Sequence, residues 1–100
     1  MAEQKSFDEL KELYLARLTQ YVPIVDRVHG SKHPEFHDVF SIYKQMNRKI
    51  TDAAAGNADL NEEFSRLRAI TSNYCAPGDA CETYQAVFQM LSELDKAYGS

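Results

Sequence analysis

Tryptophan is absent from this 100-residue sequence, and glycine and proline are scarce, with 4 and 3 residues. So few turn-forming residues leave little room for long loops or many tight turns. No hydrophobic run approaches the roughly 18 residues that a membrane-spanning helix needs, so no membrane partner is expected. Residues 1–13 are charged and lack the apolar segment of a signal peptide, which predicts a cytoplasmic location.

Basic residues are neither numerous nor clustered. The 11 lysines and arginines are scattered along a chain whose net charge is −4. No stretch is therefore typical of a phosphate-binding surface, and no nucleic-acid partner is expected. The sequence also lacks a glycine-rich phosphate loop and a specific nucleophile–base pattern. An enzyme with a complete active site is therefore not expected.

The hydrophobic residues recur with a helical period along the whole chain, and no stretch alternates as a strand does. Helices are predicted at about residues 7–29, 34–54, 59–74 and 79–98. Their short connections favour antiparallel neighbours. The predicted fold is all-α, a single-domain antiparallel up-down four-helix bundle.

Local signals predict where these helices begin and end. Pro34 suits the first position of the second helix, Pro23 should kink or break the first, and Gly30 should end it in a left-handed conformation. Three pairs with the spacing of a capping box predict the starts of the first, third and fourth helices: Ser6 with Glu9, Asp59 with Glu62, and Asp79 with Glu82.

The three histidines, His29, His33 and His37, lie within nine residues and are the candidate metal ligands. Imidazole is a common ligand of zinc and iron, and His33 and His37 have the spacing of neighbours on a helical face. Gly30 and Pro34 interrupt the register, so His29 need not join them. The alternative is structural, with a core-facing His29, a helix-capping His33 and an exposed His37. Nearby carboxylates are possible additional ligands or partners of the ligands: Asp26, Glu35 and Asp38.

Cys75 and Cys81 flank a predicted turn and are the candidate redox thiols. Their five intervening residues do not match the CxxC spacing of redox and zinc motifs. If Asp79 caps the fourth helix, Cys81 occupies its second position, where the helix dipole favours a thiolate, although Asp79 and Glu82 oppose this. The alternative is two ordinary cysteines, and a cytoplasmic setting argues against a disulfide across the turn.

Two parts of the sequence together resemble the repair-of-iron-centres family. They are VDRVHGSKHPEF at residues 25–36, and LRAITSNY at 67–74 followed by PGDACETY at 77–84, about a third of the chain. Members of this family are hemerythrin-like di-iron proteins linked to restoring iron–sulfur clusters after nitrosative or oxidative stress. The resemblance implies a helical bundle that holds metal between helices. It also implies a metal role for His29 and, less clearly, for His33.

The chain departs from the family at most of the metal ligands. Asp8 stands where the family's first helix carries a ligand histidine, and Ala53 and Asn57 stand near further ligand positions. The sequence ends at Ser100, before the family's final His-x-x-x-Glu helical extension, and has no N-terminal cysteine-bearing domain. A di-iron site needs about five to seven side-chain donors, of which His29 is the one clearly retained. The resemblance is therefore to a short form, with iron as its expected cofactor at an incomplete site.

These observations predict one leading function and leave two alternatives. The leading function is iron–sulfur cluster repair in a stress response, with iron held transiently by the histidines or with help from a protein partner. The first alternative is a metal-free helical module that binds a protein partner or forms a homodimer. The second is a thiol sensor centred on Cys81.

Overall fold

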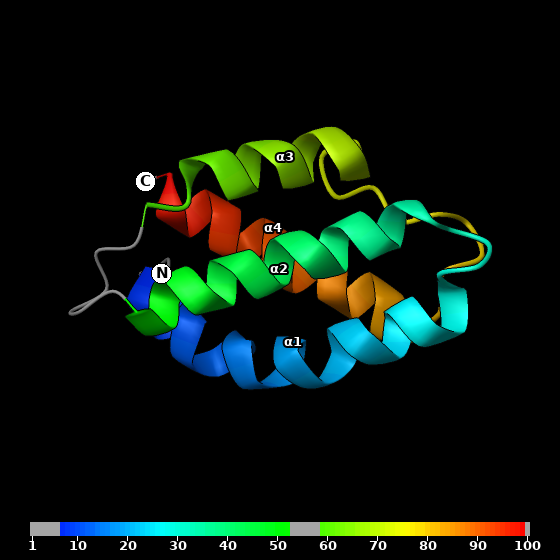
Figure 1. Cartoon of the computed structure of the whole chain (residues 1–100), viewed down its shortest axis with the longest axis horizontal. Coiled ribbons are helices and arrows are strands. Elements are labelled where there is room, and N and C mark those ends of the chain that lie inside the picture. The colour runs from blue at the N-terminus through cyan, green and yellow to red at the C-terminus, as the bar shows by residue number, and fades with distance from the viewer. Residues whose placement is uncertain (1–6, 53–58, 100) are drawn as a thin grey trace, which may run out of the picture.

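The computed structural model describes residues 7–52 and 59–99. Within these ranges the chain forms four helices and no strand: α1 (Phe7–His29), α2 (Glu35–Asp52), α3 (Asn61–Thr71) and α4 (Glu82–Tyr98). Successive helices run in opposite directions (Figure 1). α1 packs closely against both α4 and α2, and α2 packs against α3. The predicted all-α four-helix bundle is thereby confirmed.

One hydrophobic core joins the four helices, and aromatic rings fill much of it. Phe36, Phe64 and Tyr84 are each at most 1% exposed. The ring of Phe36 lies edge-to-face on Tyr84, with 5.1 Å between centroids, and stacks on Phe88 at 6.2 Å. Burying each large apolar side chain contributes about 1.5–3 kcal/mol to the stability of the fold. The buried phenylalanines and tyrosines therefore stabilise this core without any tryptophan.

α1 continues through Pro23, so the helix is not broken there. Proline has no amide hydrogen, and the carbonyl of Thr19 therefore loses its normal partner within the helix. The hydroxyl of Tyr43, from α2, lies against this part of α1. It donates a hydrogen bond to the carbonyl of Leu15 at 3.1 Å and lies 2.8 Å from the hydroxyl of Thr19. None of the helices in the described ranges is long and apolar enough to cross a membrane.

The second and third helices begin one or two residues later than predicted. α2 starts at Glu35, directly after Pro34. α3 starts at Asn61, and Leu60 stands at its N-cap without a side-chain bond. Asp59 is close by, and its carboxylate accepts the backbone amide of Asn61 at 3.2 Å. Ser6 of the first predicted capping box lies outside the described residues, as do Ala53 and Asn57 near the predicted end of the second helix.

The fourth helix begins at Glu82, and its N-cap is Cys81. The sulfur of Cys81 accepts the backbone amide of Tyr84 at 3.5 Å. The prediction that Asp79 caps this helix, and that Cys81 occupies its second position, is therefore wrong. The carboxylate of Asp79 contacts His33 instead, so it is not used as a cap.

The connections after α1 and α3 also differ from expectation. The φ angle of Gly30 lies outside the left-handed range, so the predicted left-handed cap is wrong. A Cβ atom on Gly30 would collide with the carbonyl oxygen of Asp26 and lie 2.7 Å from Cε1 of His37, so glycine is needed for this close approach. α3 ends at Thr71 rather than near residue 74, because the next three residues are left-handed.

Candidate functional site

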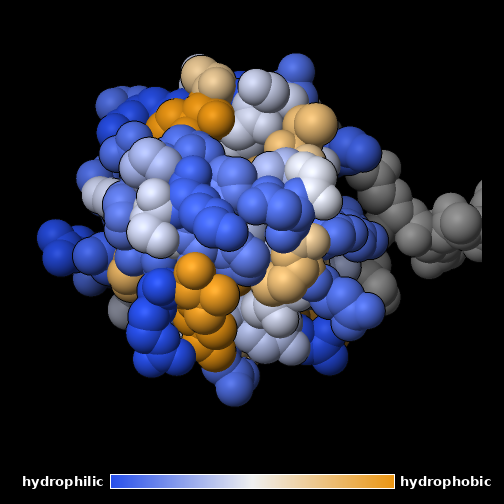
Figure 2. Space-filling model, turned by 90° about the vertical axis from the view of Figure 1, so that its right-hand side faces the viewer, coloured by the Kyte–Doolittle hydropathy of each residue, from blue (hydrophilic) through white to orange (hydrophobic). Residues whose placement is uncertain are grey.

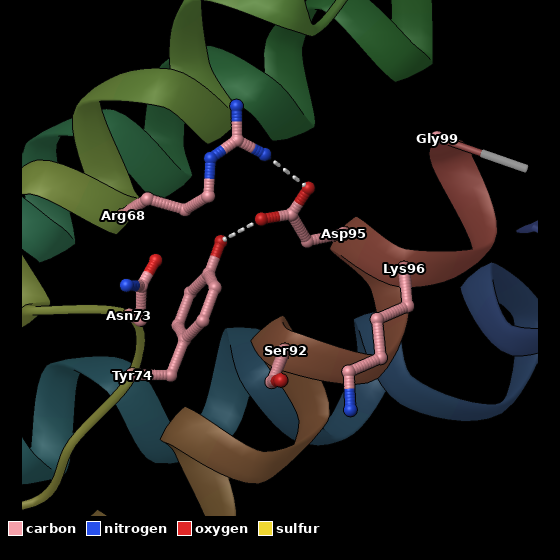
Figure 3. Close-up of a pocket in the computed structure, with 7 residues that line it drawn as sticks. All are labelled: Arg68, Asn73, Tyr74, Ser92, Asp95, Lys96 and Gly99. Atoms are coloured by element: carbon pink, nitrogen blue, oxygen red, sulfur yellow. Dashed lines mark hydrogen bonds and ion pairs between the residues drawn. The ribbon is translucent and has the colours of Figure 1, made fainter.

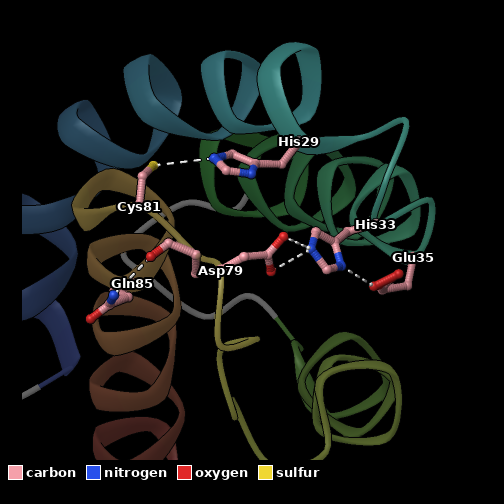
Figure 4. A network of polar contacts seen from close by, with 7 residues as sticks. His29, His33, Glu35, Asp79, Cys81 and Gln85 are labelled. Carbon is pink, nitrogen blue, oxygen red and sulfur yellow. Dashed lines mark hydrogen bonds and ion pairs between the residues drawn. The ribbon is translucent and has the colours of Figure 1, made fainter.

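Two segments far apart in the sequence meet at one end of the bundle, the end that faces the viewer in Figure 2. The first is the end of α1 with its connection to α2, and the second is the loop from α3 into α4 (Figure 1). Two side-chain pairs join them, His29 with Cys81 and His33 with Asp79 (Figure 4). Each pair takes one residue from each of the two parts of the sequence that resemble the repair-of-iron-centres family. We call these four residues the His–Cys end.

The first pair joins the last residue of α1 to the N-cap of α4. Nε2 of His29 lies 3.3 Å from Sγ of Cys81, and which atom donates depends on the histidine tautomer. The imidazole ring packs edge-to-face on Tyr84, with 5.1 Å between centroids. Since the sulfur also accepts the amide of Tyr84, an imidazole and a backbone N–H both face it. The imidazole nitrogen and the sulfur are both ligand types that zinc and iron accept.

The second pair is a histidine held between carboxylates. Nε2 of His33 lies 2.9 and 3.2 Å from the two carboxylate oxygens of Asp79, and Nδ1 lies 3.5 Å from Glu35. The hydrogen bond from His33 holds the pKa of the Asp79 carboxyl below its usual value. Burial raises the pKa of the neighbouring Tyr84 phenol to about 12, and the charges of Glu35 and Asp79 add to this effect.

His37 lies apart from the His–Cys end. Because α2 begins at Glu35, His33 precedes the helix and does not share a helical face with His37. Nδ1 of His37 lies 2.5 Å from Oδ1 of Asp26. That oxygen is buried and has no partner with hydrogen-bond geometry, so the contact is close but poorly aligned. Three carboxylates were predicted as possible ligands or partners of the ligands. Asp26 contacts His37, Glu35 contacts His33, and Asp38 is exposed.

The described residues do not supply the ligand set of a di-iron centre. Across residues 7–52 and 59–99, no three His, Cys, Asp or Glu side chains are grouped to hold a metal ion. The spacing within one pair does suit a single ion. The 3.3 Å between His29 and Cys81 is near the about 3.5 Å that separates nitrogen and sulfur ligands on a tetrahedral ion. Each pair therefore offers two donors and leaves the other coordination positions to water or to another molecule.

Both cysteines are free and exposed, but their surroundings differ. Cys81 belongs to the His–Cys end. Cys75 instead lines a cavity of about 260 Å³ together with Phe88 and with Glu35 and Tyr84, which contact the histidines of that end. Its sulfur has no histidine contact among the residues that the structure describes. The two candidate thiols are therefore chemically unequal, which their spacing in the sequence could not indicate.

Asp79, a member of this end, and Tyr84, which packs against its two histidines, were not singled out as site residues from the sequence. Asp79 was expected to cap a helix, and Tyr84 was expected only in the core. Their common signal is position, because both lie in the segment PGDACETY that carries the resemblance.

No family model matches the chain, and no solved structure matches it significantly. The resemblance to the repair-of-iron-centres family is therefore carried by the two sequence segments alone.

Proposed function

We propose that this protein takes part in iron–sulfur cluster repair during stress in the cytoplasm, and that it holds ferrous iron transiently at the His–Cys end. The observation that supports this proposal is the meeting of the two resembling segments in space. His29 with Cys81, and His33 with Asp79, each pair one residue from each segment. Iron is cargo in this proposal, received from and passed to other molecules.

The chemistry of the four side chains suits loose iron binding. Imidazole nitrogen, sulfur and carboxylate oxygen are all ligands that iron accepts. Two donors in each pair bind an ion weakly, and a transiently held ion has to exchange. Cys81 is exposed, and the Asp79 side chain is 55% exposed, so an ion can enter and leave. Glu35 contacts the second nitrogen of His33 and orients its ring, as partners of metal-binding histidines do.

The test is an anaerobic titration of ferrous iron in competition with a coloured chelator, which measures affinity without trapping the ion. Wild type, His29→Gln and His37→Gln are compared. His37 is the matched control, because it is a histidine near the same turn but pairs with Asp26. We expect binding in wild type and His37→Gln, and affinity at least about tenfold weaker in His29→Gln. Equal affinity in all three proteins would contradict the proposal.

A metal-free interaction module is the second candidate function. Leu13, Ile24 and Val28 are large apolar residues that are 49%, 38% and 61% exposed. On a regular helix these positions fall within about 60° of one another, so they share one side of α1. Exposed apolar side chains on one helix side favour a protein partner or a second copy.

Sedimentation of wild type and the Ile24→Glu, Val28→Glu double variant discriminates this second function. Self-association in wild type alone, with no iron affinity that depends on His29, would favour the interaction module. Monomers in both proteins, with iron affinity lost in His29→Gln, would favour the iron function.

A further inference from the structure

A second polar site lies between α3 and α4, away from the three histidines. These two helices are not among the closely packed pairs in the described ranges. A cavity of about 540 Å³ lies between them, and its walls include Arg68, Asn73, Tyr74, Asp95 and Lys96 (Figure 3). Cavities that bind small molecules usually measure about 300–1,000 Å³, so this one is large enough for a small ligand.

A buried carboxylate anchors one wall of the cavity. The side chain of Asp95 is 10% exposed. One of its oxygens accepts a hydrogen bond from Nη1 of Arg68 at 2.7 Å. The other accepts a hydrogen bond from the hydroxyl of Tyr74 at 2.8 Å. Burial, and then this hydrogen bond, raise the pKa of the Tyr74 phenol, which therefore stays neutral and donates. The negative charge of Asp95 is thus offset from both sides.

Arg68 has N–H donors that its contact with Asp95 does not use. A guanidinium carries five N–H groups in a rigid fork, and the contact with Asp95 occupies one nitrogen. The side chain is 46% exposed where it lines the cavity. The planar fork of the guanidinium suits a carboxylate or phosphate group.

The backbone beside the cavity is held in an unfavourable conformation. Ser72, Asn73 and Tyr74 have φ angles of 53°, 62° and 65°, a left-handed run without any glycine. For residues such as Ser72 and Tyr74 this conformation costs about 1–2 kcal/mol each. The hydroxyl of Thr71 accepts the amide of Tyr74 at 2.7 Å and helps to hold the run. Strain of this kind concentrates at ligand sites, and here it places Asn73 and Tyr74 on the cavity wall.

We propose that this cavity binds a small molecule through its carboxylate or phosphate group. The unused edge of the Arg68 guanidinium receives the anionic group, and Asn73 and Ser92, which also line the cavity, supply further donors. The segment 67–74 contributes three of the wall residues but none of the histidines or cysteines. The proposal needs no iron and does not depend on the function proposed above.

The test is an NMR titration of the intact chain with inorganic phosphate and, separately, with acetate, at an ionic strength held constant with sodium chloride. Arg68→Gln is compared with Arg66→Gln, which removes the same charge from an exposed position on the same helix. We expect saturable shifts at Asn73 and Lys96 in wild type and Arg66→Gln, and affinity about tenfold weaker in Arg68→Gln. Saturation with one anion alone identifies the ligand group. Linear shifts, or equal losses in both variants, would overturn the proposal.

A second variant should change the anion affinity in the opposite direction. Asp95→Asn removes the carboxylate that competes for Arg68, so anion affinity should rise severalfold in a protein that circular dichroism shows to be folded. A folded Asp95→Asn protein that binds more weakly than wild type would contradict the proposed role of Arg68. If this variant does not fold, the comparison of Arg68→Gln with Arg66→Gln still decides the matter.

Discussion

Replacing Tyr74 with phenylalanine tests the Arg68–Asp95–Tyr74 cluster quantitatively. The change keeps the ring but removes the hydroxyl that donates to Asp95 at 2.8 Å. Asp95 is 8% exposed, so water cannot readily replace this donor. Hydrogen bonds to charged groups contribute about 1.5–3 kcal/mol. In a domain of this size, such a loss should lower the Tm by roughly 6–15 °C.

The chain offers a matched control for this change. The hydroxyl of Tyr14 also donates to a carboxylate, that of Glu93, at 2.8 Å. Glu93 is only partly buried, so water can replace the lost donor. Tyr14→Phe should therefore cost less than about 1 kcal/mol. Urea unfolding of wild type, Tyr74→Phe and Tyr14→Phe at pH 7 measures how much unfolding free energy each variant loses. Equal costs for the two variants would refute the argument that burial of the acceptor sets the magnitude.

The same variant has a pH signature. The pKa of Tyr74 is raised above its ordinary value of 10.0 in the folded protein, chiefly by burial and then by the hydrogen bond to Asp95. The neutral phenol therefore contributes stability below pH 10, and this contribution is lost as the pH rises above 10. The stability difference between wild type and Tyr74→Phe should shrink above pH 10. A difference that stays constant up to pH 11 would contradict the assignment.

Three further predictions concern Gly30, Ser72 and Cys81. Gly30→Ala should destabilise the fold by about 1–3 kcal/mol, because the added Cβ meets the ring of His37 and the α1 backbone; an unchanged urea midpoint would contradict this. Ser72→Gly should stabilise by about 1 kcal/mol by relieving a left-handed residue, and a lower Tm would show that the strain argument is wrong. Cys81 should react with iodoacetamide several times faster than Cys75 at pH 7, because an imidazole and an amide face its sulfur; peptide mapping of the alkylated protein measures both rates.

The helical pattern of the sequence was sufficient to predict the four helices and the bundle that they form, but not which helices pack closely. Leu18, Val22 and Val25 recur at helical spacing, and all three are at most 1% exposed on α1. Such spacing has few solutions, because the apolar side of each helix must be covered by another helix. The bounds of α1 agree with the prediction at both ends.

Helix ends and side-chain partners depend on contacts between residues far apart, and these were not predictable. Asp79 has the local pattern of an N-cap, but His33 lies 46 residues earlier and takes its carboxylate. The left-handed run before Cys75 has no glycine to signal it. Tyr74 is held there by Asp95, which lies 21 residues further along. In both cases a tertiary contact overrides a local preference.

The sequence singled out some residues of the candidate site but did not predict its arrangement. His29 and Cys81 were both singled out, yet their contact joins residues 52 positions apart. His37 was grouped with the other histidines because of its spacing, whereas the turn at Gly30 directs it to Asp26. Proximity in sequence is thus a poor guide to which ligands can meet when a turn lies between them.

The most direct test of the proposed iron function is repair of a damaged cluster. An iron–sulfur enzyme that has lost cluster iron to peroxide is incubated anaerobically with this protein and ferrous iron, in the presence of a chelator that suppresses free iron. We predict that activity returns faster with wild type than with ferrous iron alone, and that His29→Gln loses this advantage. The same recovery with wild type, with the variant and without protein would contradict the proposal that the His–Cys end handles iron.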